Sequence, residues 1–272
     1  MSVSLEQQIL ITKSALNMLT DIHNFKGRTS FPHFNRTGLS EAQVFALLAG
    51  LDSLIPYYIR NYTTTTTADE HGNWSWTFLI EYTGNDRTEL ISCQNAVTQS
   101  VSFLAPQLFK EKMPDYVRVY RACAFLAGSV SYENCPESNP HLHNAYGALI
   151  KGSCGCQGYA LALKLLMDAA GVPCIVISGP VLKEAGAYAC SRFDYDVRTK
   201  TTRHYWNLVG IETTAGIRYF HVDVCWGQKE KEFDLTYFLK DDYFMQKSRK
   251  WDYESYPACK VLPGNDMEKL LR

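Results

Sequence analysis

Two cysteines, Cys154 and Cys156, lie two residues apart in the stretch GSCGCQGYA, just before a long apolar run. Cysteines at this spacing could bind a metal, form a redox pair or provide a nucleophile. Residues 157–170 are apolar nearly all round, which predicts a buried helix that ends at Gly171. Cys156 would start that helix, where unpaired backbone N–H groups and the helix dipole favour a thiolate. Its position therefore makes Cys156 the candidate nucleophile.

A base and a residue to orient it are predicted on a β-hairpin further along the chain. The segments HYWNLVGIE and IRYFHVDVC read as two strands joined by TTAG. If TTAG is a four-residue loop, Glu212 pairs with Ile217, and His204 and Asp223 become diagonal neighbours on one face. Such neighbours have Cα atoms ~7–8 Å apart, so the carboxylate could orient the imidazole toward a thiol. A slip of one residue would move Asp223 to the other face. His221 is an alternative base nearer the turn.

The same residues allow other interpretations. Cys156 could be a structural cysteine at a helix start, and the His–Asp pair could share a face by chance. The side chains of His141, His143, Cys154 and Cys156 could together bind zinc, although no second cysteine pair follows. A Cys154–Cys156 redox pair would lack the usual C-x-x-C spacing.

Composition narrows the class of protein. The 272 residues carry a net charge of −1 with no Lys/Arg run, so we expect no nucleic-acid partner. No apolar stretch approaches the ~20 residues of a membrane span. Nine cysteines at irregular spacing do not form a small disulfide scaffold, which mildly favours a reducing compartment. The first residues lack a signal-peptide pattern, so we expect a cytoplasmic location, or secretion if a leader precedes this chain.

The remaining pattern indicates an α+β chain. Helices are predicted over residues 5–23, from Ser40 onward and within 93–130, with a β-hairpin between about 58 and 84. A strand, VPCIVIS, is predicted to end at Gly179-Pro180, and residues 181–203 read as a long irregular segment. The aromatic-rich tail from 234 to 259 is expected to pack back on the body. No internal repeat and no convincing domain linker is visible.

The motifs CQGYALALKLLMDAAG, HYWNLV and YFHVDVCW together resemble the transglutaminase-like superfamily of thiol enzymes, especially its bacterial members. Those proteins show Cys-x-Gly-Tyr-Ala at a helix start, then His-Ala-Trp-Asn, then Asp-x-Thr-Trp. The resemblance extends over about residues 105–259. It therefore implies an N-terminal helical and β-hairpin extension, 1–104, and a catalytic core, 105–272. It implies a papain-like core, with a nucleophile helix packed on an antiparallel sheet. It also implies Cys156 as nucleophile, His204 as base and Asp223 as the residue that orients the base.

The resemblance further implies thioester acyl transfer on amide bonds of proteins or peptides, by a peptidase, deamidase or cross-linking transglutaminase. A non-catalytic, protein-binding scaffold of the same fold is the alternative. No cofactor or metal is implied, and no phosphate-binding or calcium-binding loop is visible. Tyr205 and Cys225 depart from the family motifs at positions that could reshape the cleft. The candidate cleft residues are Tyr146, Gln157, Gly158, Tyr159, Tyr205, Trp206 and Trp226.

Overall fold

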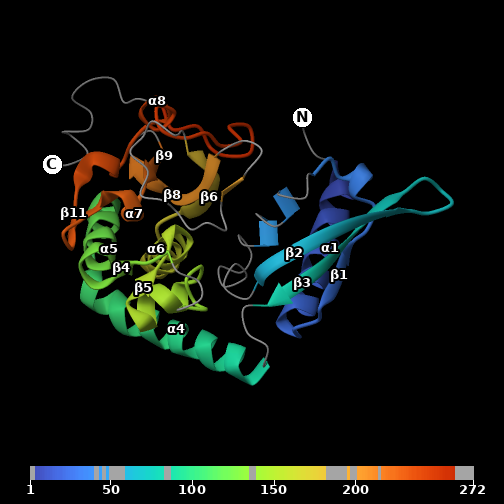
Figure 1. Cartoon of the computed structure of the whole chain (residues 1–272). Helices are drawn as coiled ribbons and strands as arrows, with labels where there is room; N and C mark the ends of the chain where they lie inside the picture. The colour runs from blue at the N-terminus through green and yellow to red at the C-terminus, as the bar shows by residue number, and fades with distance from the viewer. Residues whose placement is uncertain are drawn as a thin grey trace. The chain divides into compact units, whose positions relative to one another are not determined.

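The computed structural model describes residues 4–39, 43–44, 47–48, 59–82, 87–134, 139–181, 195–196, 201–213 and 216–260 (Figure 1). The fold divides into two compact units, residues 1–92 and 93–272. The division along the chain falls within helix α4 (Arg87–Leu108). The sequence boundary after residue 104 falls nearer the end of that helix and stays a prediction.

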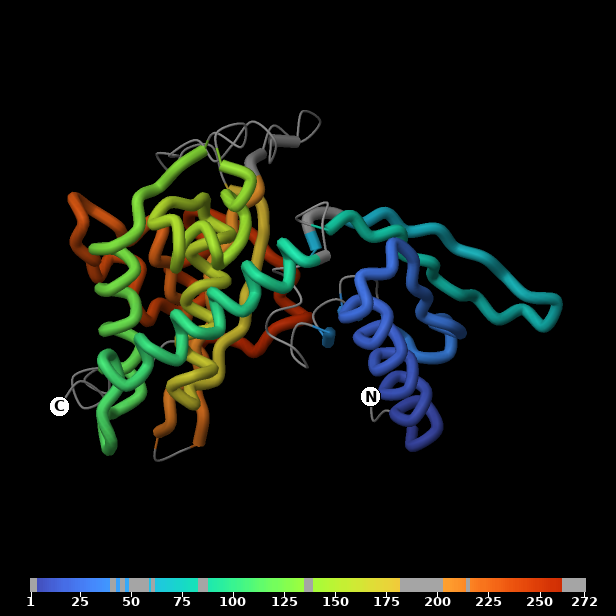
Figure 2. Tube along the Cα trace, turned by 90° about the horizontal axis from the view of Figure 1, so that it is seen from below, coloured from blue at the N-terminus to red at the C-terminus, as the bar shows by residue number. Residues whose placement is uncertain are grey.

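The first unit combines one helix with a three-stranded antiparallel sheet. Helix α1 (Leu5–His23) begins with a capping box, in which Ser4 and Gln7 exchange hydrogen bonds, and confirms the predicted helix. The predicted hairpin is also confirmed, as β2 (Ile59–Ala68) and β3 (Trp74–Tyr82), and its tip projects past α1 (Figures 1 and 2). The sheet order is β1-β3-β2, and β1 (Arg28–Phe31) was not predicted. Helix η1 (Phe34–Arg36) follows β1. The helix predicted from Ser40 lies mostly outside the described residues.

The second unit packs helices against a four-stranded antiparallel sheet, which confirms the α+β prediction. The predicted helical region becomes α4 and α5 (Asp115–Ser129), and α6 (Cys156–Ala170) contacts both α5 and the sheet. The strands are β6 (Cys174–Val181), β7 (Tyr195–Asp196), β8 (Thr201–Thr213) and β9 (Gly216–Val222). β8 is the central strand, and β6 pairs with one of its edges. β7 pairs with the start of β8 along the other edge, and β9 pairs with the end of β8 along that same edge. None of the helices in the described residues is long and apolar enough to cross a membrane.

The hairpin register is the one that the sequence predicts. Glu212 pairs with Ile217, and the ladder runs unbroken to the pair Asn207–Val222. Pairing extends one step further toward the turn than expected, to Thr213–Gly216, and residues 214–215 lie outside the described residues. β9 ends one residue before Asp223, which becomes the N-cap of α7 (Val224–Gly227).

The predicted end of β6 at Gly179-Pro180 is wrong, because β6 continues through both residues to Val181. β6 lies at a sheet edge, where a proline's missing N–H breaks no ladder bond. The C-terminal tail runs along this edge, and the Lys250 N–H donates to the Pro180 carbonyl at 3.0 Å. A Cβ on Gly179 would lie 1.8 Å from the Lys250 carbonyl oxygen. Glycine at this position therefore permits the close approach of the tail.

The tail itself packs on the sheet, as expected. Met245, Trp251 and Cys259 join Ile177, Trp206 and Leu208 in one buried cluster. The short elements of the unit are β4 (Ser131–Tyr132), η2 (Gly147–Lys151), β5 (Ser153–Cys154), β10 (Gln228–Lys229), β11 (Glu232–Phe233), η4 (Leu235–Tyr237) and α8 (Asp242–Met245).

Candidate active site

Cys156 begins helix α6, as its sequence position predicts. Gly155 is the N-cap, and no side chain caps the first N–H groups, which carry the positive end of the helix dipole. The helix ends at Gly171, whose φ of 71° lies in the left-handed region that favours glycine. Cys156 is not part of a disulfide and is 2% exposed. Its sulfur is thus positioned at the electropositive end of a buried helix.

The first turn of α6 is joined to strand β8, which carries His204. Asn207 on β8 donates its side-chain N–H to the carbonyl of Ala160 at 2.9 Å. The side chains of Asn207 and Ala160 are buried. This bond fixes the helix start against the strand, so the predicted nucleophile and the predicted base belong to directly contacting elements.

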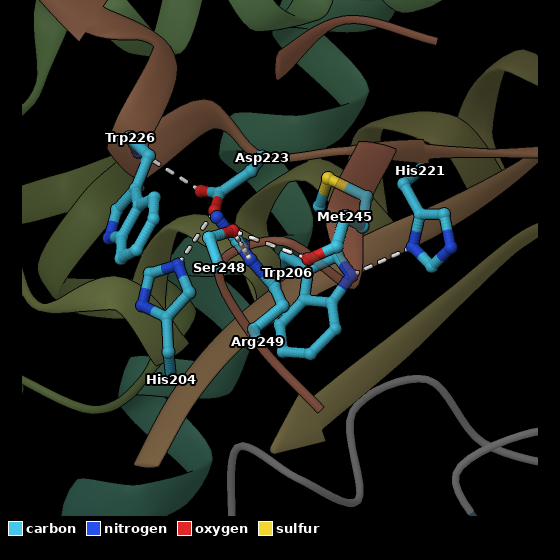
Figure 3. Close-up of polar contacts among 8 residues, drawn as sticks. All are labelled: His204, Trp206, His221, Asp223, Trp226, Met245, Ser248 and Arg249. Carbon is cyan, nitrogen blue, oxygen red and sulfur yellow. Dashed lines mark hydrogen bonds and ion pairs between the residues drawn. The ribbon is translucent and has the colours of Figure 1, made fainter. Parts of the chain in front are cut away.

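His204 and Asp223 form a hydrogen-bonded pair, as the register predicts. His204 Nε2 lies 2.7 Å from Asp223 Oδ2, and both residues are 0% exposed (Figure 3). The Trp226 backbone N–H donates to the other carboxylate oxygen at 3.0 Å. Burial would raise the pKa of Asp223, but the charges of His204 and Arg249 and their hydrogen bonds outweigh it and hold that pKa well below its usual range. Asp223 is therefore an ionised acceptor that fixes Nε2, and Nδ1 is the ring nitrogen suited to exchange a proton with a thiol.

Arg249 is a member of this cluster that the sequence did not predict. Its Nη1 donates to Asp223 Oδ2, the same oxygen that His204 contacts. The guanidinium carbon lies over the ring centroids of Trp226, Trp206 and Tyr237, at 4.1, 5.0 and 5.2 Å. The contact joins residues 26 positions apart, through a tail with no regular periodicity. Nothing in the local sequence marks Arg249 as a partner of Asp223.

His221, the alternative base, is held in a separate network. Trp206 Nε1–H donates to His221 Nδ1 at 2.9 Å, and His221 Nε2 lies 2.9 Å from Asp242 Oδ1. Burial lowers the pKa of His221, although Asp242 opposes this effect. Both ring nitrogens are thus engaged away from Asp223, and the ring anchors Trp206 to helix α8.

His221, Asp242 and Cys259 also place their donor atoms within 4.8 Å of one another, as in a metal site. The protonation of the His221 ring argues against a metal site here. An indole N–H can only donate, so Nδ1 of His221 must accept, and Nε2 carries the proton of the neutral ring. A metal on Nε2 would require a proton on Nδ1, pointing at the Trp206 N–H. In the described part of the chain this is the one such group, so the earlier candidates His141, His143, Cys154 and Cys156 do not come together as ligands.

Cys154 is a packing residue. Its side chain is buried, and burial raises the pKa of its thiol well above the usual value, with Glu133 adding to the effect. Cys154 and Cys156 do not form a disulfide with each other. A Cβ on Gly158 would lie 2.8 Å from the Cys154 sulfur. The space at Gly158 is therefore filled by Cys154, not left open for a substrate.

The candidate cleft residues fall into two groups. Tyr159 is buried and donates its hydroxyl hydrogen to the Val130 carbonyl at 2.7 Å, and Trp206 lies in the core beneath the tail. These two side chains pack the fold. Those of Tyr146, Gln157, Tyr205 and Trp226 are partly exposed, so their place in a cleft stays a prediction. Trp226 lies beside the base, with ring centroids 5.0 Å apart.

Comparisons with known proteins agree with this arrangement at the level of the family. Residues 102–224 match the model of the transglutaminase-like superfamily, a range that includes Cys156, His204 and Asp223. None of the curated proteins matches the chain.

Three solved structures are similar to it. One, a TGase, is 9% identical, with a TM-score of 0.35, and the match covers 68% of this chain and 48% of that one. A candidate protease from Parabacteroides distasonis is 12% identical (TM-score 0.29; 65% and 41% covered). A candidate cysteine protease from Cytophaga hutchinsonii is 11% identical (TM-score 0.35; 61% and 62% covered). The matches thus span less than two thirds of the length of each of these proteins.

Proposed function

Since the chain carries a transglutaminase-like core over residues 102–224, we propose that it is a thiol enzyme that performs acyl transfer on amide bonds of proteins or peptides. Cys156 is the nucleophile, His204 the general base and acid, and Asp223 the residue that orients the base. The observation that carries the proposal is the buried His204–Asp223 pair, on a strand bonded to the helix that Cys156 begins.

The reaction proceeds in two halves. His204 Nδ1 takes the thiol proton, and the Cys156 sulfur attacks the amide carbonyl to form a tetrahedral oxyanion. Backbone N–H groups at the start of α6 stabilise that oxyanion. The C–N bond then breaks, and the imidazolium gives its proton to the departing amine. A thioester on Cys156 remains, and water or a second amine releases it while His204 accepts the proton of the incoming group.

The buried setting strengthens this chemistry and restricts access to it. With the side chains of His204 and Asp223 shielded from water, their electrostatic interaction is weakly screened. Cys156 is 2% exposed, so a protein substrate reaches it only after local movement. The same burial is the observation that favours the alternative, a non-catalytic protein-binding scaffold of this fold.

The decisive experiment compares Cys156→Ala with Cys154→Ala. Each protein is incubated with a glutamine-containing peptide and a primary amine, and covalent intermediates and products are followed by intact mass. We expect a thioester adduct on the parent protein and on Cys154→Ala, and none on Cys156→Ala. The product mass separates cleavage, deamidation and amine incorporation. An adduct on Cys156→Ala and none on Cys154→Ala would refute the assignment of Cys156 as the nucleophile. No adduct on any of the proteins would favour the non-catalytic scaffold.

A further inference from the structure

Arg249 reaches the candidate active site from outside the region that matches the family model, which ends at residue 224. It lies in the tail segment that runs along β6, where it forms an antiparallel bridge with Val181. The next residue, Lys250, donates its N–H to the Pro180 carbonyl. The backbone of the tail is therefore fixed to the sheet at this position, and the Arg249 side chain extends from it into the interior (Figure 3).

The guanidinium has an unusual set of neighbours. Arg249 is 0% exposed, and within the described residues its one ion-pair partner is Asp223. Its Nε donates to Ser248 Oγ at 3.2 Å, whereas Nη2 is buried without a hydrogen-bond partner in the described structure. Three aromatic rings lie around the guanidinium carbon in place of a second carboxylate. Such a burial is costly unless the cation has a fixed partner, so its contact with Asp223 must persist.

One oxygen of Asp223 contacts both the His204 imidazole and the Arg249 guanidinium. Oδ2 receives His204 Nε2 at 2.7 Å and Arg249 Nη1, whereas Oδ1 receives the Trp226 backbone N–H at 3.0 Å. A lone carboxylate would strongly stabilise a protonated imidazole. A guanidinium on the same oxygen offsets that negative charge and repels the imidazolium. The proton affinity of His204 therefore depends on Arg249.

We propose that Arg249 is a positioning residue for His204: it holds the Asp223 carboxylate against the imidazole and, by sharing the oxygen that the ring contacts, weakens the ring's hold on its proton. The inference rests on the proposed function for its catalytic meaning. It predicts that removal of Arg249 raises the proton affinity of His204. It also makes the C-terminal tail part of the active site.

Three further titratable groups in the described part of the chain interact with this cluster. Tyr237 on η4 faces both Arg249 and Asp223, and burial raises its pKa, so it is neutral. Cys123 on α5 lies within the field of Asp223, and burial keeps its thiol protonated. His221 on β9 senses Arg249 and is favoured in its neutral form. These three groups are favoured in their neutral forms, so Arg249 is the charge whose removal should matter most.

The test is the titration of His204 by NMR in histidine-labelled protein that carries Cys156→Ser, so that no thiol titrates in the pair. The resonance is assigned with His204→Gln. Arg249→Gln should raise the His204 pKa by roughly one to two pH units, the order expected for loss of a charge on the same oxygen. Lys250→Gln, which removes the exposed neighbouring cation of the tail, is the matched control and should leave it unchanged.

An unchanged His204 pKa in folded Arg249→Gln protein would overturn the inference. If that variant does not fold, Asp223→Asn is compared with Asp223→Asn/Arg249→Gln. The double variant should have the higher His204 pKa, and equal values would overturn the inference equally. Because these titrations need no reactive thiol, they are independent of the adduct experiment on Cys156. Failure of the proposed function is thus distinguishable from failure of the role of Arg249.

Discussion

Gly179→Ala tests how the tail is attached to the sheet that carries the candidate base. Gly179 pairs with His204 across the β6–β8 ladder. A Cβ at this position would lie 1.8 Å from the Lys250 carbonyl oxygen and 2.9 Å from its carbonyl carbon. Both atoms belong to backbone, which cannot rotate away as a flexible side chain can. The tail must therefore shift, and Arg249 shifts with it.

The expected loss of stability is the difference between two opposed effects. Overpacking against a fixed backbone costs about 3 kcal/mol. Removing a glycine from a strand restores up to about 1 kcal/mol of backbone entropy. We therefore expect the free energy of unfolding to fall by about 2 kcal/mol, as measured by urea denaturation.

Gly128→Ala provides the control. Gly128 lies in α5, where an added Cβ would meet its nearest atom, the Lys231 carbonyl oxygen, at an ordinary 3.4 Å. This variant should be more stable than the parent by about 0.5–1 kcal/mol, since alanine is the better helix former. If Gly179→Ala were as stable as the parent protein, the tail would not pack against β6 as described, and the placement of Arg249 would be in doubt.

Three further predictions concern stability and pH. The pKa of Asp223 is lowered in the fold, so the ionised carboxylate contributes to the free energy of unfolding above about pH 4, and this contribution is lost as the pH falls further. Asp223→Asn should remove this part of the pH dependence from acid-unfolding curves. The pKa of His221 is also lowered, so stability should fall as the pH drops below about 6.5, by up to about 1.4 kcal/mol per pH unit, and His221→Gln should reduce that slope in urea titrations. Tyr159→Phe removes the hydrogen bond to the Val130 carbonyl and should cost about 1–2 kcal/mol in thermal or urea unfolding, without changing the pH dependence of Cys156 alkylation.

Local patterns predicted the parts of the site that depend on neighbouring residues in the chain. The apolar run and its terminal glycine are sufficient to define α6, and the TTAG turn fixes the register that brings His204 to Asp223. These features follow from helix burial and from the two-residue period of a strand, which act over short distances.

The features that the sequence did not predict depend on contacts between distant segments. β1 is a four-residue strand in an apparent loop, and it exists because β3 pairs with it. Gly179 and Pro180 continue a strand because the tail covers its edge. Trp206 is a candidate cleft residue from the sequence, yet it lies in a buried cluster with residues of the tail. The role of Arg249 arises from the same tail.

The most direct test of the central claim is the pH dependence of Cys156 alkylation by iodoacetamide, followed by peptide mass spectrometry. The shape of the profile, unlike the absolute rate, does not depend on how often the buried thiol becomes accessible. A thiol activated by His204 should stay reactive well below the ~8.5 pKa of free cysteine, and His204→Gln should abolish that reactivity. A profile that follows free cysteine, and that His204→Gln leaves unchanged, would contradict the account.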